Sequence, residues 1–159
     1  MMAKADMITF RCIASGEETR VTATRSFTLI AIVLLAWNLM GVAAFVLQFT
    51  ADLDTLARTD PYTAQIFARM PGWAWIAYAV AVGAGTVGAV LLLLRKAAAT
   101  WLFLASLVAV LAQFGHSFLG TDMLAVKGPT TLIFPAVIVL IAVAQWLYAR
   151  SLTAKGALR

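Results

Sequence analysis

Four long stretches of the chain are almost purely apolar, and short polar segments separate them. They cover residues 27–49, 73–94, 100–119 and 130–149, and none contains Asp, Glu, Lys or Arg. A helix needs about 20 apolar residues to cross the ~30 Å hydrocarbon core of a bilayer. The stretches also lack the polar–apolar alternation of a membrane β-strand. The pattern therefore predicts an all-α fold, a bundle of four transmembrane helices.

The first apolar stretch resembles a secretory signal peptide only at first sight. It is longer than the apolar core of such a peptide, which has about 7–15 residues. It also carries Asn38 near its centre and ends in Gln48 and Phe49 without a clear cleavage motif. We therefore expect a retained helix.

Basic residues are distributed unevenly between the two sides of the spans. Nine of the 12 lie in the N-terminal segment, in the turn at Arg95 and Lys96, or in the C-terminal tail, and only Arg58, Arg69 and Lys127 lie on the other side. The positive-inside rule then predicts that both termini are cytoplasmic. Four acidic residues fall on the outer side: Asp52, Asp54, Asp60 and Asp122.

Composition supports a membrane protein and argues against several other classes. Apolar residues make up 63% of the chain and charged residues 12%, whereas soluble domains have about 45–50% and 25%. The net charge of +5 comes from basic residues at the span ends, so we expect no nucleic-acid partner. A single cysteine, Cys12, and a single histidine, His116, offer no disulfide and no metal-ligand cluster, so we expect no cofactor and no metal.

The longest connection between spans, residues 50–72, contains a helix-start signal. Asp60 can cap a helix whose first residue is Pro61. Apolar side chains then recur at helical spacing, which predicts a short amphipathic helix in this first outer loop. The aspartates of the loop lack the glycine turn and terminal glutamate of an EF-hand, so we interpret them as a solvated acidic loop.

Residues 1–20 differ from the remainder of the chain and show no periodic pattern. Two interpretations stay open. The segment is either a disordered tail or an extension upstream of a start codon at Val21, preceded by the purine-rich codons of Glu17 and Glu18. In both cases residues 21–159 form the four-helix membrane domain.

The second span contains a run of small residues. Gly83, Gly85 and Gly88 match the pattern GxGxxG, but a nucleotide-binding loop would follow a strand, and this run lies inside an apolar span. Ala77, Ala81, Gly85 and Gly88 recur at helical spacing, which predicts a small-residue face for close helix packing. The partner is a helix of the same chain or of a second copy.

Uncharged polar side chains interrupt the spans, and such residues either bind between helices or form a functional site. They are Asn38, Gln48, Ser106, Gln113, His116, Ser117 and Gln145. The structural interpretation is hydrogen bonding between helices. The functional interpretation is an outward-facing polar cluster, capped by the acidic loop, that involves Gln48, Gln113, His116 and Ser117, with Asn38 deeper in the first span. In that case His116 could bind a solute or a proton.

A family resemblance extends over residues 26–159. The chain resembles a group of small bacterial inner-membrane proteins with four helices, mostly uncharacterised and sometimes labelled "sugar transporter". The motifs that carry it are Trp37-Asn38-x-x-Gly41, Phe45, Gln48, Pro71-x-Trp73, Gly85-x-x-Gly88, Arg95, Gln113-Phe114, Phe134-Pro135, Arg150 and Leu158-Arg159. Phe45 replaces a more usual Tyr, so that hydroxyl is not required here. The resemblance implies an inner-membrane location but assigns no site residue.

Two functions are compatible with these features. The first is a non-enzymatic packing or accessory protein of the bacterial inner membrane that forms a homo-oligomer or joins a larger membrane complex. The second is a small-solute transporter that acts as an oligomer, because four short helices enclose little space. The spans contain no Ser–His–Asp set and no carboxylate pair, so we do not expect an enzyme.

Overall fold

The chain forms helices throughout its described part. The structure, a computed structural model, describes the backbone of residues 3–159 and the side chains of residues 25–159. The elements are α1 (Ala3–Phe49), α2 (Leu53–Thr59), α3 (Pro61–Arg69), α4 (Gly72–Leu93), α5 (Ala99–Leu119), α6 (Met123–Lys127), the 3-10 helix η1 (Pro129–Leu132) and α7 (Ile133–Ala154). The backbone of residues 3–20 is part of α1, and their side chains lie outside the described residues. Whether residues 1–20 are a tail or an extension upstream of a start at Val21 stays open.

Four of these helices are long and apolar enough to cross a membrane, as the sequence predicts. The candidate spans are Arg25–Phe49, Gly72–Leu93, Ala99–Leu119 and Pro129–Ala154. The fourth continues beyond its predicted end at Ala149. The apolar stretch ends where the helix leaves the membrane, but the helix itself continues to Ala154. In this continuation Arg150 lies over the Trp146 ring of the preceding turn, 5.6 Å from its centroid.

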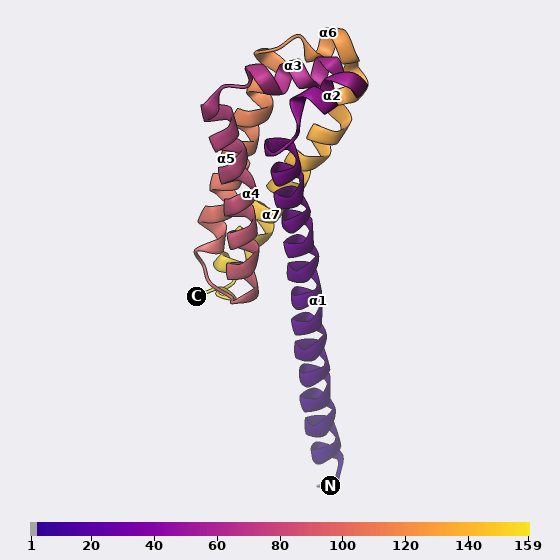
Figure 1. Ribbon diagram of the computed structural model, residues 1–159. Helices are drawn as coiled ribbons and strands as arrows, with labels where there is room; N and C mark the ends of the chain where they lie inside the picture. The colour runs from indigo at the N-terminus through magenta and orange to yellow at the C-terminus, as the bar shows by residue number, and fades with distance from the viewer. Residues whose placement is uncertain (1–2) are drawn as a thin grey trace.

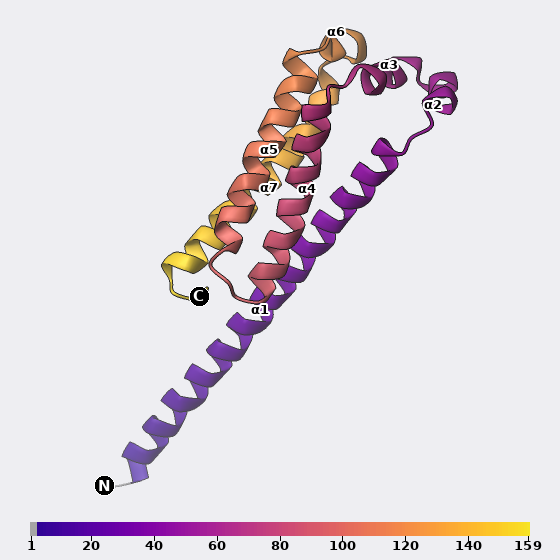
Figure 2. The same cartoon turned by 60° about the vertical axis from the view of Figure 1, so that its left-hand side comes forward.

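The four long helices are packed in chain order. Contacts join α1 to α4, α4 to α5, and α5 to α7, whereas α1 and α7 share few contacts in the described part of the chain. Figure 2 shows α1 diverging from the other three helices toward the end that carries α2 and α3, and both Figure 1 and Figure 2 show its N-terminal part extending beyond them. Large apolar side chains on all four helices point outward; Leu47, Ile76, Val108 and Leu140 are each at least half exposed. Such surfaces suit contact with lipid.

The small-residue face of α4 packs inside the chain. This face consists of Ala77, Ala81, Gly85 and Gly88, of which Ala77 is half-buried and the others are buried. A methyl group on Gly85 would overlap Oδ1 of Asn38 on α1, and one on Gly88 would lie 3.2 Å from the Phe103 ring on α5. A methyl group on Gly83 would meet nothing within 4 Å. The face is therefore occupied by α1 and α5.

Short helices gather at one end of the molecule, where Figures 1 and 2 show α2, α3 and α6, and Figure 2 places α3 between the other two. The predicted loop helix is α3, which begins at Pro61 and is capped by Asp60, whose carboxylate accepts from Thr63 N at 3.1 Å. The structure adds α2 and α6, which the sequence pattern does not reveal. The two helices have seven and five residues, which is shorter than the windows of about 11–18 residues in which helical periodicity is detected.

At the opposite end, the C-terminal residues close onto the turn between α4 and α5. Arg159 N donates to Arg95 O at 2.8 Å, and Ala97 N donates to Arg159 O at 2.9 Å. Leu158 is 4% exposed and joins a core cluster that includes Phe103 and residues of α1, α4 and α7. The tail thus belongs to the packed structure.

Candidate functional site: a chamber among the spanning helices

A cavity of about 620 Å³ lies among α1, α4, α5 and α7, beneath α3. This volume lies within the range of small-molecule sites in proteins, about 300–1,000 Å³. Most of its lining is apolar, and among the residues whose side chains are described no Asp, Glu, Lys, Arg or His contributes to it. We call this cavity the chamber.

At one end of the chamber, which we call its floor, two hydrogen bonds join pairs of helices. Asn38 Nδ2 on α1 donates to Leu34 O at 2.7 Å and to Gln145 Oε1 on α7 at 3.3 Å. Ser106 Oγ on α5 donates to Ala81 O on α4 at 2.6 Å. All three polar side chains are buried, and each has a partner, as buried polar groups in proteins normally do.

A cluster of aromatic side chains, which we call the aromatic wall, joins α1, α3 and α4. It consists of Phe45, Phe67, Trp75 and Tyr78, of which Phe67 and Tyr78 line the chamber. Gln48 Nε2 donates to the Tyr78 hydroxyl at 3.3 Å, and the Phe45 ring meets the Tyr78 ring edge-on with centroids 5.1 Å apart. Phe67 of α3 packs edge-on against Trp75 of α4 at 5.8 Å. The wall therefore connects α1 and α4 to α3 and holds α3 over the chamber.

Gln113 differs from the other buried polar residues of the chamber. Its side chain is 8% exposed, and Gln113 is part of the lining. Its Oε1 has no hydrogen-bond partner within the described residues. It is placed two turns from Ser106 along α5, a rise of about 10 Å. The Oε1 oxygen is enclosed, with almost no accessible surface, so Gln113 contributes to the lining through its other atoms.

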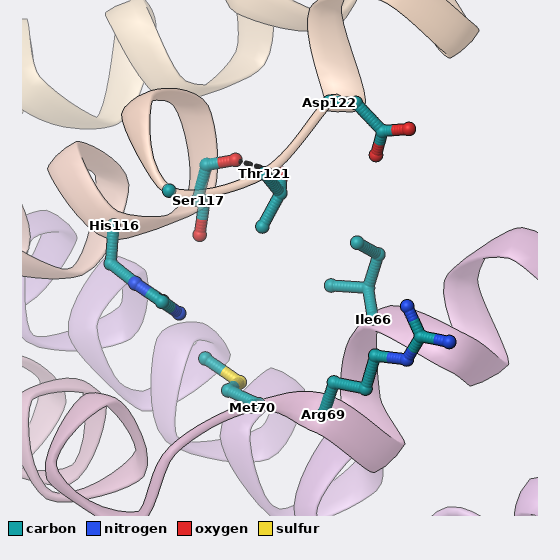
Figure 3. A pocket seen from close by; sticks show the side chains of 8 residues that line it. Ile66, Arg69, Met70, His116, Ser117, Thr121 and Asp122 are labelled. Atoms are coloured by element: carbon teal, nitrogen blue, oxygen red, sulfur yellow. Dashed lines mark hydrogen bonds between the residues drawn. The ribbon is translucent and has the colours of Figure 1, made fainter.

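A second, smaller pocket of about 330 Å³ lies outside the chamber. Figure 3 shows Ile66, Arg69 and Met70 on one side of it and the end of α5 on the other. From that side it is lined by His116, Ser117, Gly120, Thr121 and Asp122. This outer pocket shares Ile66, Met70 and Ser117 with the chamber, so these side chains separate the two spaces.

Two polar contacts hold α3 to the segment after α5. The Lys127 ammonium forms an ion pair with Asp60 and also donates to Thr63 Oγ1 at 2.8 Å. The Tyr62 hydroxyl donates to Asp122 Oδ1 at 2.7 Å. The hydrogen bond from Lys127 has the largest effect on the pKa of Asp60, and the hydrogen bond from Thr63 has the next largest. Together they lower this pKa from its ordinary 3.8 to about 2. We use the name α3 latch for the contacts of Lys127 with Asp60 and Thr63 together with the Tyr62–Asp122 hydrogen bond.

The candidate residues from the sequence divide between the two spaces. Asn38, Gln48, Gln113 and Ser117 line the chamber, whereas His116 lines only the outer pocket, where its ring lies 4.9 Å from the Trp73 ring. The bond between Asn38 and Gln145 was not foreseen. Seven uncharged polar positions in four spans allow many pairings, and spacing along one helix does not select among them.

Tyr78 is a chamber residue that the sequence analysis missed. It lies in the lining and accepts from Gln48. Its hydroxyl is the only signal that could have identified it, because a buried tyrosine usually finds a hydrogen-bond partner. Near the outer end of a span, an interfacial aromatic gives the same sequence signal.

The chemistry of the chamber is that of binding and orientation. Amides and hydroxyls can hold a ligand by hydrogen bonds, and the apolar walls can bury its carbon skeleton. Among the residues whose side chains are described, no three His, Cys, Asp or Glu lie together as metal ligands. Comparison with known proteins adds no relative, because no protein-family model, curated protein or solved structure matches this chain.

Proposed function

We propose that this protein is a non-enzymatic, multi-pass protein of the bacterial inner membrane that binds a small molecule in the chamber. The observation that carries the proposal is the chamber itself, about 620 Å³ of space bounded by all four spanning helices. The space lies between α1 and α7, which share few contacts in the described part of the chain, so side chains leave it open and a small molecule can occupy it. The described lining residues include no ionised group, which favours binding over acid–base catalysis.

Both termini are proposed to be cytoplasmic, on the strength of charge. The Arg95–Lys96 turn and the C-terminal tail lie at one end of the molecule, and α2, α3 and α6 lie at the other (Figures 1 and 2). A reporter that is active only in the periplasm should be silent when fused after Arg159 and active when inserted within residues 55–62. The reverse pattern would contradict the proposed orientation.

Self-association belongs to the proposal but needs a surface other than the small-residue face. That face is occupied by α1 and α5 of the same chain. A homo-oligomer, or a larger membrane complex, would instead use the lipid-facing surfaces of the four helices. Chemical crosslinking in native membranes, followed by mass measurement, tests this part of the proposal.

Transport of a small solute is the second candidate function. The outer pocket and the chamber share a wall formed by Ile66, Met70 and Ser117. Movement of α3 would join the two spaces, which gives a bound molecule a route toward the outer side. Uptake into vesicles that contain the purified protein would separate transport from binding alone.

The binding proposal is tested by filling the chamber. Val110 lines it, whereas Val108 on the same helix is 59% exposed and lies outside it. Purified protein is screened by thermal unfolding against neutral apolar small molecules, and a ligand raises the melting temperature as its concentration exceeds the Kd. Val110→Phe should abolish the ligand-induced rise, and Val108→Phe should keep it. Equal responses in the two variants would refute binding in the chamber.

A further inference from the structure

Two hydrogen-bond donors in the chamber lining have no acceptor in the described part of the chain. The amide nitrogen of Gln113, Nε2, makes no hydrogen bond there, and unlike the oxygen of the same amide it is not enclosed. The Tyr78 hydroxyl accepts from Gln48 and donates to no described group. By contrast, the hydroxyls of Ser106 and Ser117 donate to backbone carbonyls. Gln113 and Tyr78 therefore keep donors available to a molecule in the chamber.

The two donors lie at a similar depth of the bundle, on neighbouring helices. Tyr78 is in the second turn of α4, which begins at Gly72, and Gln113 is in the second-last turn of α5, which ends at Leu119. Both of these helix ends lie at the end of the molecule that carries α3 and α6 (Figure 2). At 1.5 Å per residue, each donor is about 9 Å below that end. A ligand at this depth therefore meets donors from both α4 and α5.

The charge of the lining limits the ligand further. Among the residues whose side chains are described, no acidic residue, basic residue or histidine lines the chamber. An ionised ligand group buried there would lose its hydration without gaining a counter-charge. A carboxylate, phosphate or ammonium is therefore disfavoured, and a neutral acceptor such as a carbonyl oxygen suits the two donors.

Aromatic side chains in the lining suit a flat ring. Trp37, Phe114, Phe118 and Phe134 all contribute to it, and the Phe114 and Phe118 rings lie 6.2 Å apart. Flat rings pack against such side chains in offset or edge-on contacts. The chamber also lies between α1 and α7, which share few contacts, so it borders the region that lipid would occupy. A molecule dissolved in the bilayer can enter between these two helices.

We propose that the chamber binds a neutral, lipid-soluble molecule with a flat ring and carbonyl acceptors, of the general kind of a quinone. This inference rests on the proposed binding function and names its ligand class. A ring carbonyl accepts from Gln113 Nε2 or from the Tyr78 hydroxyl, and the ring lies against the aromatic side chains. A quinone ring has no donor of its own, so it requires no acceptor from the lining.

A matched set of probes tests this assignment. The ring skeleton is the same in 2,3-dimethyl-1,4-naphthoquinone, its hydroquinone and 2,3-dimethylnaphthalene, but only the quinone has acceptors without donors. Their Kd values are measured with the full chain in lipid nanodiscs, and empty nanodiscs supply the correction for partition into lipid. The quinone should bind about tenfold more tightly than the hydrocarbon, the difference expected for one well-placed hydrogen bond. The hydroquinone, kept reduced, should bind more weakly than the quinone, because each of its hydroxyls also needs an acceptor.

Variants then assign the preference to the two donors. Gln113→Leu should weaken quinone binding about tenfold and leave hydrocarbon binding unchanged, and Tyr78→Phe should act in the same direction. The matched controls are Gln65→Leu, at an exposed position of α3, and Tyr148→Phe, outside the chamber lining. Both should behave as the unmodified protein. Because the quinone-to-hydrocarbon ratio is measured first in the unmodified protein, the test does not depend on the folding of a variant.

The outcomes distinguish this inference from the binding function. Equal binding of quinone and hydrocarbon by the unmodified protein would overturn the role of the two donors and leave the chamber as a binding site. Tighter binding of the hydroquinone would overturn the preference for an acceptor. A quinone preference that survives in both Gln113→Leu and Tyr78→Phe would overturn the assignment to these residues. No binding of any probe would overturn the inference, and the broader screen with Val110→Phe would decide the binding function separately.

Discussion

Asn38 on α1 donates a hydrogen bond to Gln145 on α7 over 3.3 Å, although the two residues are 107 positions apart in the chain. Their helices otherwise share few contacts. The helices contact one another in the order α1–α4–α5–α7, and this bond joins the first helix to the last at one level of the bundle. The chamber lies between α1 and α7 beyond that level. Gly85 makes the bond possible, because a methyl group at that position would occupy the place of Asn38 Oδ1.

The Asn38–Gln145 bond should contribute measurably to stability. Unfolding free energies of Asn38→Leu, Gln145→Leu and the double variant should yield a coupling of about 0.6 kcal/mol and at most ~2, as for other hydrogen bonds between membrane helices. Asn38→Leu combined with Gln48→Leu serves as the control, since no hydrogen bond joins that pair, and its effects should be additive. Additive effects in both pairs would show that the Asn38–Gln145 bond adds nothing to stability.

Gly85 should be the most sensitive glycine of α4. Gly85→Ala forces Asn38 away from its place between α1 and α7, and we expect a loss of at least about 1 kcal/mol in unfolding free energy. Gly83→Ala meets open space and should be neutral or stabilising by up to ~1 kcal/mol, because alanine favours a helix. Thermal unfolding in detergent compares the two, and equal damage would contradict the assigned contact.

The four spans could be predicted because lipid imposes one strong condition on sequence. A segment such as Gly72–Leu93 must be apolar over its whole length and must satisfy its own backbone, so composition alone identifies it. Asp60 and Pro61 added a local signal for α3. No comparable condition acts on α2, which lies outside the spans and buries no residue.

The chamber was less predictable for a related reason. Hydropathy cannot tell a lipid-facing side chain from one that faces a cavity, because both are apolar. Gln113 and Ser117 stood out as polar positions and line the chamber, but His116 stood out equally and lies in the outer pocket. Which face of α5 turns inward depends on the packing of α4 and α7 against it, and α5 itself carries little record of that packing.

The C-terminal contact should be a second point of stability, remote from the chamber. Leu158 is 4% exposed and packs with Phe103, so Leu158→Ala should lower the unfolding free energy by about 2–3 kcal/mol through the cavity it leaves. Leu147→Ala is the control, because Leu147 on α7 is 49% exposed. Chemical unfolding in detergent measures both variants. A loss below about 0.5 kcal/mol for Leu158→Ala would mean that the tail is not held as described.

The α3 latch should weaken only in strong acid. The folded-state pKa of Asp60 is lowered from 3.8 to about 2, chiefly by the hydrogen bond from Lys127. Because the lowered pKa favours the ionised carboxylate, the stabilisation is complete above the ordinary value of 3.8 and is lost as the pH falls through about 2. Hydrogen exchange of α3 amides, corrected for intrinsic rates, should therefore stay slow at pH 4 and rise near pH 2.

Lys127→Met supplies the comparison that assigns this behaviour to the latch. Without the ammonium, Asp60 keeps only its contacts with Thr63, so its titration, followed by the ¹³C shift of the carboxyl carbon, should move upward toward 3.8. Asp52 is the internal control. Its pKa is lowered by hydrogen bonds from Thr55 and from Asp54 N, within its own helix cap, and Lys127→Met should leave its titration unchanged. If Asp60 titrated near 3.8 in the unmodified protein, Lys127 would not hold α3 in place, and the roof of the chamber would depend on Tyr62 and the aromatic wall alone.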